Sequence, residues 1–179
     1  MSSPRDRLLE ELGISRSAML DRGLREYKEA DLLHVAEVGD DGREHLLIPE
    51  AATAWRRLKA AAADDGVTVY IVSAFRSVVR QAQIVRGKLD RGESIDDVLT
   101  ISAAPGFSEH HSGRAVDLGT VGARSLEVEF AQTPAFVWLA ANARRFDFVL
   151  SYPIGNSLGY QYEPWHWCFR GNTLKRSDR

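Results

Sequence analysis

The feature that most constrains the fold is a pair of clusters rich in histidine and acidic residues, far apart in the chain. The first cluster is the stretch 108–117 (SEHHSGRAVD), and the second is the stretch 163–167 (EPWHW). Together they offer the imidazoles and carboxylates that bind one divalent metal ion. If both clusters serve one ion, the fold must bring two distant segments together.

The two clusters predict a catalytic zinc site. Such sites usually take three protein ligands and leave a fourth position for water. A histidine of the first cluster, Asp117 and His166 would supply this set. Gly113 allows an unusual backbone bend, and Asp117 then lies on one face of a short predicted strand. Spacing alone does not decide which histidine, His110 or His111, is the ligand.

Glu163 is the candidate proton acceptor. It lies three residues before His166, and side chains at that spacing on a straight strand point to opposite faces. We expect Pro164 to bend the chain so that both side chains reach the site. A glutamate beside zinc accepts a proton from water and passes it to a leaving amine. Taken alone, Glu163 would be a surface carboxylate beside a proline.

Arg76 is the candidate for binding negative charge. It follows a predicted apolar strand, and its planar fork suits a carboxylate or a developing oxyanion. A simple ion pair is the alternative, at about even odds. Isolated histidines such as His34 and His45 are more often structural than ligating, and Cys168 is expected to be a small buried residue. Aromatic residues near the second cluster could line a pocket, but aromatic-rich strands are more often core.

Length and composition favour one soluble domain spanning residues 1–179. The net charge of −2 gives no reason to expect nucleic acid or an anionic membrane as partner. One cysteine forms no internal disulfide, and no run approaches the roughly 18 apolar residues that cross a bilayer. The start of the chain lacks a signal-peptide pattern, so we expect a cytoplasmic location as written, or the periplasm or cell envelope if a leader has been trimmed.

Hydrophobic periodicity predicts a mixed architecture of helices and strands. The predicted helices are Arg5 to Leu12, Pro49 to Asp64, Val78 to Leu89, Ser94 to Leu99 and Thr133 to Arg145. The predicted strands are Leu32 to Val38, Glu44 to Ile48, Val67 to Val72, Phe146 to Leu150 and Tyr160 to Phe169. The tail from Gly171 to Arg179 is expected to be a frayed terminus. The motifs of the helical zinc proteases, the serine-hydrolase elbow and glycine-rich phosphate loops are absent.

With these residues assembled, the sequence resembles the M15 metallopeptidases, which include VanY-type D-alanyl-D-alanine carboxypeptidases and dipeptidases and the related L,D-carboxypeptidases. The resemblance runs from about Ile48 to Arg170. It is carried by three motifs in the family's order: SAFRS at 73–77 with Gln81, the Ser-x-His-x-x-Gly-x-Ala-x-Asp pattern at 108–117, and EPWH at 163–166.

The resemblance implies an α+β fold, with a small antiparallel sheet surrounded by helices and zinc in a cleft on the sheet. It implies His110, rather than His111, as a zinc ligand with Asp117 and His166. It gives Glu163 the role of general base. Arg76 would steady the substrate carbonyl or carboxylate. Positions that contact substrate in relatives are matched by Gln81, Ser108 and Tyr152.

The implied activity is zinc-dependent hydrolysis of a peptide bond next to a D-amino acid in peptidoglycan stem peptides, by a D,D- or L,D-carboxypeptidase. The alternatives are a muropeptide-recycling dipeptidase, an endolysin-type L,D-endopeptidase, and a non-catalytic zinc-stabilised module that binds cell-wall peptides. Ala74 and Phe75 depart from the family's usual glycine and tyrosine, the segment between Tyr152 and Glu163 is short, and the stretch 1–45 has no recognised match. None of these departures involves the proposed metal ligands; they bear on the identity of the substrate.

Overall fold

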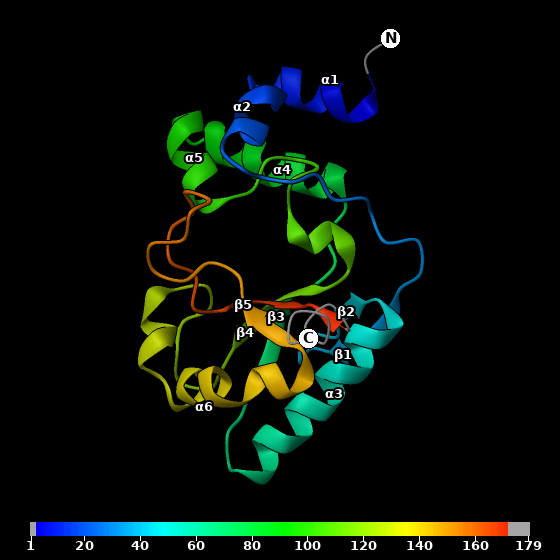
Figure 1. Ribbon diagram of the computed structural model, residues 1–179, viewed down its shortest axis with the longest axis vertical. Helices are drawn as coiled ribbons and strands as arrows, with labels where there is room; N and C mark the ends of the chain where they lie inside the picture. The colour runs from blue at the N-terminus through cyan, green and yellow to red at the C-terminus, as the bar shows by residue number, and fades with distance from the viewer. Residues whose placement is uncertain (1–2, 172–179) are drawn as a thin grey trace, which may run out of the picture.

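The computed structural model describes residues 3–171, which form two layers (Figure 1). The helices are α1 Pro4–Glu11, α2 Arg16–Asp21, α3 Pro49–Asp64, α4 Val78–Leu89, α5 Ile95–Ile101 and α6 Pro134–Asn142. The strands are β1 His34–Val38, β2 Glu44–Leu47, β3 Tyr70–Ser73, β4 Ala115–Gly119, β5 Phe148–Leu150 and β6 His166–Phe169. Three short 3-10 helices are η1 Glu109–Ser112, η2 Val128–Gln132 and η3 Ala143–Phe146. The predicted α+β architecture is confirmed.

The main sheet has the strand order β3-β4-β6-β5, and all its neighbours are antiparallel. A separate antiparallel hairpin is formed by β1 and β2. In the main sheet, Asp117 on β4 lies opposite Ser73 on β3 and opposite His166 on β6. The sheet register therefore places residues from both sequence clusters side by side.

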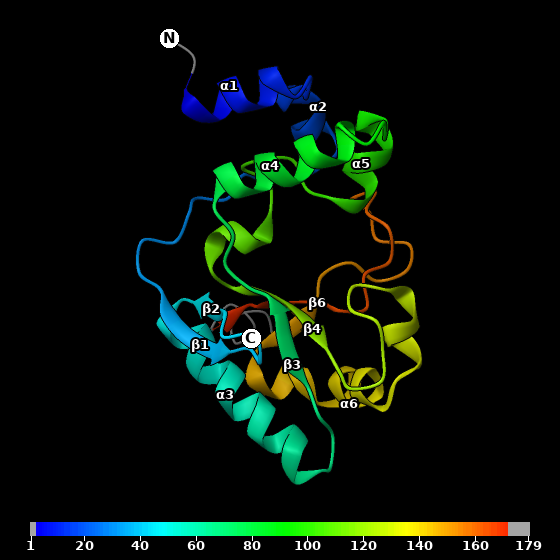
Figure 2. The same cartoon turned by 180° about the vertical axis from the view of Figure 1, so that it is seen from behind.

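One hydrophobic core lies between the main sheet and helices α3 and α6, which Figures 1 and 2 show in the lower layer. Pro49 begins α3 at a position where its missing N–H costs nothing, and Thr133 caps α6 by accepting a hydrogen bond from Phe136 N. The side chains of Trp55 and Leu58 on α3 are fully buried against the sheet. This core fixes the sheet that holds the site.

A second core joins α1, α2, α4 and α5 in the upper layer. Ser77 and Ser94 cap α4 and α5 by accepting hydrogen bonds from backbone N–H groups. The segment 24–31 runs between α2 and β1 and joins the layers; Tyr27 N donates to Gly106 O and Ala30 N donates to His111 O. The segment 24–31 is thus hydrogen-bonded to the chain at the start of the first cluster and within it.

Most predicted elements are found near their expected positions, but helix α2 was not predicted and one predicted strand is too long. The predicted strand from Tyr160 to Phe169 is wrong over its first part, because only His166–Phe169 pairs as β6. Pro164 has no N–H to donate, and His166 N instead closes a turn onto Glu163 O. The tail prediction beyond Gly171 lies outside the described residues. No helix within residues 3–171 combines the length and the apolar character needed to cross a membrane.

Candidate metal centre

The first cluster folds as a short 3-10 helix followed by a tight bend. Ser108 caps η1 by accepting a hydrogen bond from His110 N at 3.3 Å, and Gly113 ends it with a φ of +64°. A Cβ at position 113 would lie 2.9 Å from Leu33 Cδ2 and 3.1 Å from Ala30 Cβ. Glycine is therefore required both for the left-handed backbone and for the close packing. This bend turns His110 back toward β4.

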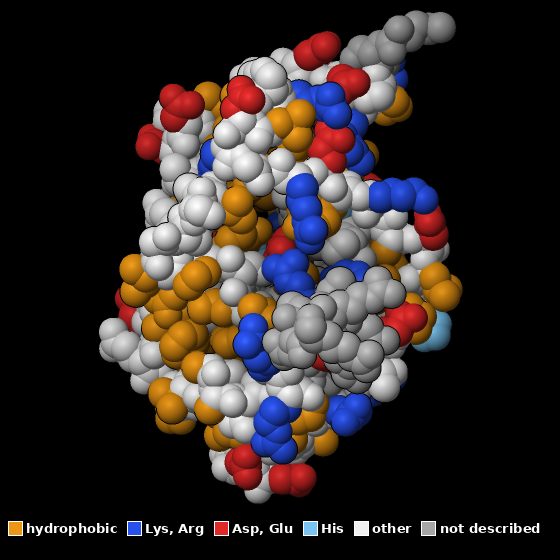
Figure 3. All heavy atoms as spheres, in the orientation of Figure 1, with side chains coloured by type: hydrophobic (Ala, Val, Ile, Leu, Met, Phe, Trp, Pro, Cys, Tyr) orange, Lys and Arg blue, Asp and Glu red, His pale blue; other side chains and the backbone are white. Residues whose placement is uncertain are grey.

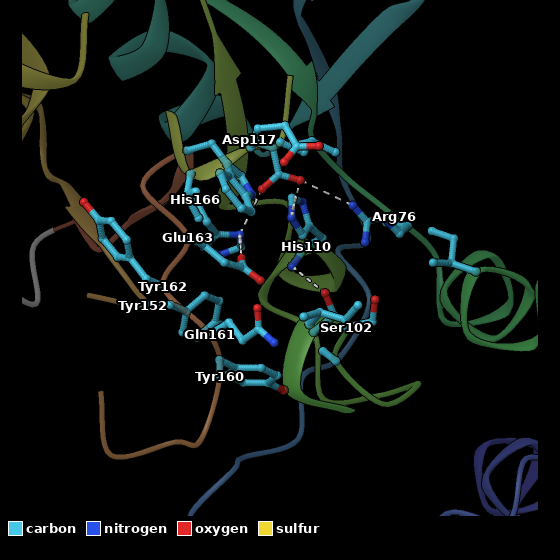
Figure 4. A pocket seen from close by; sticks show the side chains of 18 of the residues that line it. Arg76, Ser102, His110, Asp117, Tyr152, Tyr160, Gln161, Tyr162, Glu163 and His166 are labelled. Carbon is cyan, nitrogen blue, oxygen red and sulfur yellow. Dashed lines mark hydrogen bonds and ion pairs between the residues drawn. The ribbon is translucent and has the colours of Figure 1, made fainter. Parts of the chain in front are cut away.

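His110, Asp117 and His166 converge on one point (Figure 4). Each offers one ligand atom, and these atoms all lie within 4.8 Å of one another. His110 Nε2 is 3.2 Å from Asp117 Oδ2, and His166 Nδ1 is 3.0 Å from Asp117 Oδ1. All three residues are buried. Two imidazoles and one carboxylate form the donor set of a catalytic zinc site, so these residues fit that ion.

The two histidines turn different nitrogens toward this point. His110 Nδ1 lies 2.7 Å from the carbonyl oxygen of Ala74, which only accepts, so Nδ1 carries the proton and Nε2 is free to coordinate. His166 has the opposite arrangement, because its Nε2 lies 3.1 Å from Glu109 Oε2 and its Nδ1 faces Asp117. In each ring, the nitrogen that points away from the site lies within hydrogen-bonding distance of an acceptor. The acceptor is Ala74 O for His110 and Glu109 Oε2 for His166.

The site concentrates charge in a buried place. Burial opposes charging Asp117, but the adjacent histidines hold its pKa well below the usual range. Burial also acts against a charged His166, yet its hydrogen bonds to Asp117 and Glu109 raise its pKa to about 10. His166 therefore lies between two carboxylates, with Nδ1 facing Asp117 and Nε2 facing Glu109. His166 would hold a metal ion through Nδ1 only with that nitrogen unprotonated.

Glu163 lies beside the three convergent residues without joining them. Its Oε2 is 3.7 Å from His166 Nδ1, and its side chain is 14% exposed. The chain turns between Glu163 and His166, and both side chains reach the cleft, as expected from a bend at Pro164. Burial raises the pKa of Glu163 to about 7. A carboxyl group with this pKa exchanges protons readily near neutral pH.

Arg76 points into the same space from the end of β3. Its Nη2 donates to Ser73 Oγ at 2.9 Å and lies 3.5 Å from Asp117 Oδ2, and its Nη1 donates to Gln81 Oε1 at 2.8 Å. Gln81 in turn donates to Ala103 O at 2.7 Å and is 1% exposed. Gln81 therefore holds the guanidinium in place. Its predicted contact with substrate stays a prediction.

A cleft of about 410 Å³ opens over these residues, between the two layers. Ser108 and Tyr152 line it, as do Tyr160, Tyr162 and Trp165, whereas Trp167 belongs to the core. The Tyr152 ring centroid lies 4.7 Å from that of His166. Figure 3 shows hydrophobic side chains gathered on one side of this face, above α6. Leu126 and Val128 line the cleft and are exposed. The cleft thus offers apolar walls around a polar floor.

The remaining histidines lie outside the convergent set, and Cys168 is buried as predicted. His111 uses both ring nitrogens on the backbone, since Nδ1 donates to Arg76 O at 2.6 Å and Nε2 accepts from Gly106 N at 3.1 Å. Burial lowers the pKa of His111 to about 4. His34 is exposed on β1, and His45 is buried on β2. The structure thus separates His110 from His111 where spacing did not.

Sequence reasoning missed Glu109. Its carboxylate is buried and meets His166, Ser151, Arg170 and Tyr27. Hydrogen bonding to His166 and the nearby Arg170 lower its pKa well below the usual range, although burial acts in the opposite direction. The only sequence signal was its place beside His110. Its partners come from three other segments, which no spacing rule connects.

Comparisons with known proteins agree with this geometry. Residues 44–172 match the family model of VanY, D-alanyl-D-alanine carboxypeptidase. A D-alanyl-D-alanine carboxypeptidase of Enterococcus faecalis is 31% identical over 121 residues, which cover 62% of this chain and 43% of that protein. The chain spans about half the length of the curated relatives it matches.

Two solved structures show the same fold. The LdcB LD-carboxypeptidase superimposes with a TM-score of 0.73 at 28% identity, covering 83% of this chain and 72% of the other. A D,D-pentapeptidase VanY from a VanB-type resistance cassette, in complex with Zn(II), gives a TM-score of 0.62 at 29% identity, covering 78% and 79%. The segment before residue 44 lies outside the family match.

Proposed function

The chain belongs to the VanY family of D-alanyl-D-alanine carboxypeptidases, and on this basis we propose that it is a zinc carboxypeptidase that removes the C-terminal D-amino acid from peptidoglycan stem peptides. His110 Nε2, Asp117 and His166 Nδ1 would hold the ion. The observation that carries the proposal is the position of Glu163, whose Oε2 lies 3.7 Å from the ligand nitrogen of His166 but outside the ligand set.

The residues around the ion site suit peptide hydrolysis. Zinc, when bound, supplies a Lewis acid for the scissile carbonyl and lowers the pKa of water. Glu163 accepts the proton of the attacking water at its carboxylate and then donates it to the leaving amine. The raised pKa of Glu163, about 7, suits a group that must both take and give a proton.

Arg76 supplies positive charge at the same place. Its guanidinium is held by Ser73 and Gln81, so its direction is fixed before substrate arrives. A fixed donor stabilises a developing oxyanion, or binds the C-terminal carboxylate of the substrate, without reorganisation. Such a carboxylate contact distinguishes a carboxypeptidase from an enzyme that cuts inside a chain.

Defined peptides test this proposal. The zinc-loaded protein is incubated with a stem pentapeptide ending in D-Ala-D-Ala, and with a tetrapeptide ending in one D-Ala after an L-configured centre. Mass spectrometry identifies the products. We expect release of a single D-alanine from at least one peptide, and the preferred peptide assigns D,D- or L,D-specificity. The same peptides ending in L-alanine are the control and should stay intact.

Peptides with an amidated C-terminus separate the alternatives. Amidation removes the carboxylate that a carboxypeptidase requires, so we expect it to abolish cleavage. Cutting of the amidated peptide at an internal bond would identify an endopeptidase. Hydrolysis of free D-Ala-D-Ala alone would identify a dipeptidase. If the zinc-loaded protein binds these peptides and releases nothing, it is a non-catalytic binding module.

A further inference from the structure

The buried acceptor behind His166 is the strongest feature that the proposed reaction does not use. Glu109 Oε2 lies 3.1 Å from His166 Nε2, the ring nitrogen that points away from Asp117. The Glu109 side chain is only 6% exposed. We propose that Glu109 is a positioning residue, which holds the proton of His166 on Nε2 and so presents Nδ1 to the metal ion.

The carboxylate of Glu109 is itself fixed on both oxygens. Oε2 also accepts from Ser151 Oγ at 2.5 Å, and Oε1 accepts from Arg170 Nη2 at 2.8 Å and from Tyr27 OH at 3.2 Å. Ser151, Arg170 and Tyr27 all place donors on this carboxylate, which suits an ionised acceptor. A carboxylate held in this manner fixes the orientation of the imidazole ring.

The histidine tautomer is the reason that this contact matters for metal binding. A neutral imidazole has one N–H and one free lone pair, and the lone pair must face the ion. If the proton moved to Nδ1, it would point at Asp117 and occupy the ligand position. For His110 the Ala74 carbonyl oxygen performs the same task, at 2.7 Å from Nδ1. The two ligand histidines thus use different acceptors, one from the backbone and one from a side chain.

Part of this arrangement comes from outside the family match. Tyr27 lies in the segment 24–31, and the match begins at residue 44. Tyr27 is anchored there by its N–H, which donates to Gly106 O at 2.8 Å, while its hydroxyl reaches Glu109. The N-terminal segment therefore contributes to the wall behind the metal site.

The test measures zinc affinity rather than turnover. Competition with a chromophoric chelator gives the affinity of the wild type, Glu109→Gln, Glu109→Ala, Ser151→Ala and Tyr27→Phe. Loss of a carboxylate behind a ligand histidine typically weakens metal binding by roughly 10–100-fold, and we expect this for Glu109→Ala. Glu109→Gln should weaken it less, because an amide oxygen can still accept from His166 Nε2. Ser151→Ala and Tyr27→Phe keep the carboxylate, so they should weaken binding less.

Two comparisons exclude a purely structural role. Glu11→Gln is the matched control, because Glu11 also pairs with an arginine, Arg86, at 2.9 Å but on the exposed surface of α1. It should bind zinc like the wild type. If Glu109 served only the fold, Glu109→Ala would lower the melting temperature of the metal-free protein and leave the zinc affinity of the folded protein unchanged. That result would overturn the proposal.

The histidine tautomers can also be measured in the wild-type protein, so this test does not depend on whether a variant folds. Long-range proton–nitrogen NMR of the zinc-loaded, nitrogen-15-labelled protein reads the tautomer of each histidine. We expect the His166 proton on Nε2 and the His110 proton on Nδ1. A His166 ring that binds zinc through Nε2 would refute the inference.

This inference rests on the proposed metal site but not on the proposed reaction. Glu109 variants with weakened zinc binding, together with an inert wild type, would uphold the positioning role and remove the carboxypeptidase. An active wild type whose Glu109 variants bind zinc normally would uphold the carboxypeptidase and remove the positioning role.

Discussion

The rings of His110 and His166 meet edge to face, with centroids 5.0 Å apart and planes 82° apart. Each ring turns toward Asp117, but through a different nitrogen: Nε2 for His110 and Nδ1 for His166. The other nitrogen of each ring lies against an acceptor, Ala74 O for His110 and Glu109 Oε2 for His166. His110 comes from a 3-10 helix and His166 from a strand paired with β4. Two unlike elements thereby converge on one aspartate.

Neighbouring histidines give a sharp test of the ligand set. His110→Ala removes a ligand atom and should weaken zinc binding by more than the roughly 10–100-fold typical of outer partners. His111→Ala should keep stoichiometric zinc, because both nitrogens of His111 contact backbone groups. Metal content after dialysis, measured by atomic emission, checks both. Stoichiometric zinc in His110→Ala, or its loss only in His111→Ala, would show the assignment to be wrong.

Glu163→Gln separates proton transfer from metal binding. The amide keeps the shape of the side chain but cannot take a proton, so turnover should fall by about 10²–10⁴-fold. Zinc content should not change, since Glu163 lies outside the three convergent residues. Release of D-alanine and metal content are measured on the same sample. A variant that retains near wild-type turnover would exclude Glu163 as the base.

Arg76→Ala tests the fixed positive charge. Loss of a donor aimed at the developing oxyanion should lower kcat by about 10²–10³-fold. Gln81→Leu should lower it less, because the guanidinium stays but loses the 2.8 Å hydrogen bond that directs it. Steady-state kinetics on the preferred peptide compare the two variants. If Gln81→Leu were the more damaging, Gln81 itself would be the group that contacts substrate.

Local chemistry explains how much of this fold could be predicted from sequence. The helix at Pro49–Asp64 begins at a proline and follows a clear apolar spacing, and the helix at Val78–Leu89 has the predicted bounds. A short strand was also predicted to carry Asp117, and β4 Ala115–Gly119 contains it. Patterns of this kind depend on neighbours in sequence, so the sequence alone displays them.

Contacts between distant segments explain what could not be predicted. The apolar and aromatic run 160–169 looks like one strand, but the chain from Tyr160 to Trp165 lines the cleft and only His166–Phe169 finds a partner strand. Spacing left His110 and His111 equivalent, and the choice depends on where Ala74 O and Gly106 N lie. The role of Glu109 depends on its contacts with Ser151, Arg170 and Tyr27, which are distant in sequence and come together only in the fold.

Leu58→Ala tests the core beneath the site. Leu58 is fully buried on α3, and truncating such a leucine costs about 2–5 kcal/mol of unfolding free energy because it leaves a cavity. Val137→Ala is the control: Val137 is 65% exposed on α6, so the change should stay within about 0.5 kcal/mol. Urea denaturation of the metal-free proteins measures both. Equal losses would contradict the placement of this core.

Gly113→Ala tests whether the bend after η1 sets the geometry of the ligands. The residue has a φ of +64°, and an alanine there pays roughly 1–2 kcal/mol for the left-handed backbone. Its methyl group would also lie 2.9 Å from Leu33 Cδ2 and 3.1 Å from Ala30 Cβ. One of these segments must move, and Gly113 lies directly between η1 and β4, which carry His110 and Asp117.

Gly42→Ala supplies the matched control for this bend. Gly42 has a φ of +77° in the hairpin turn between β1 and β2, and a Cβ there meets nothing within 4 Å. Gly42→Ala should therefore lose stability only through the left-handed backbone, without a steric clash. We expect both variants to lose stability in urea denaturation, Gly113→Ala more than Gly42→Ala, and only Gly113→Ala to bind zinc more weakly. Equal stability losses with unchanged zinc affinity would show that the bend tolerates a side chain, and that His110 is held by other contacts.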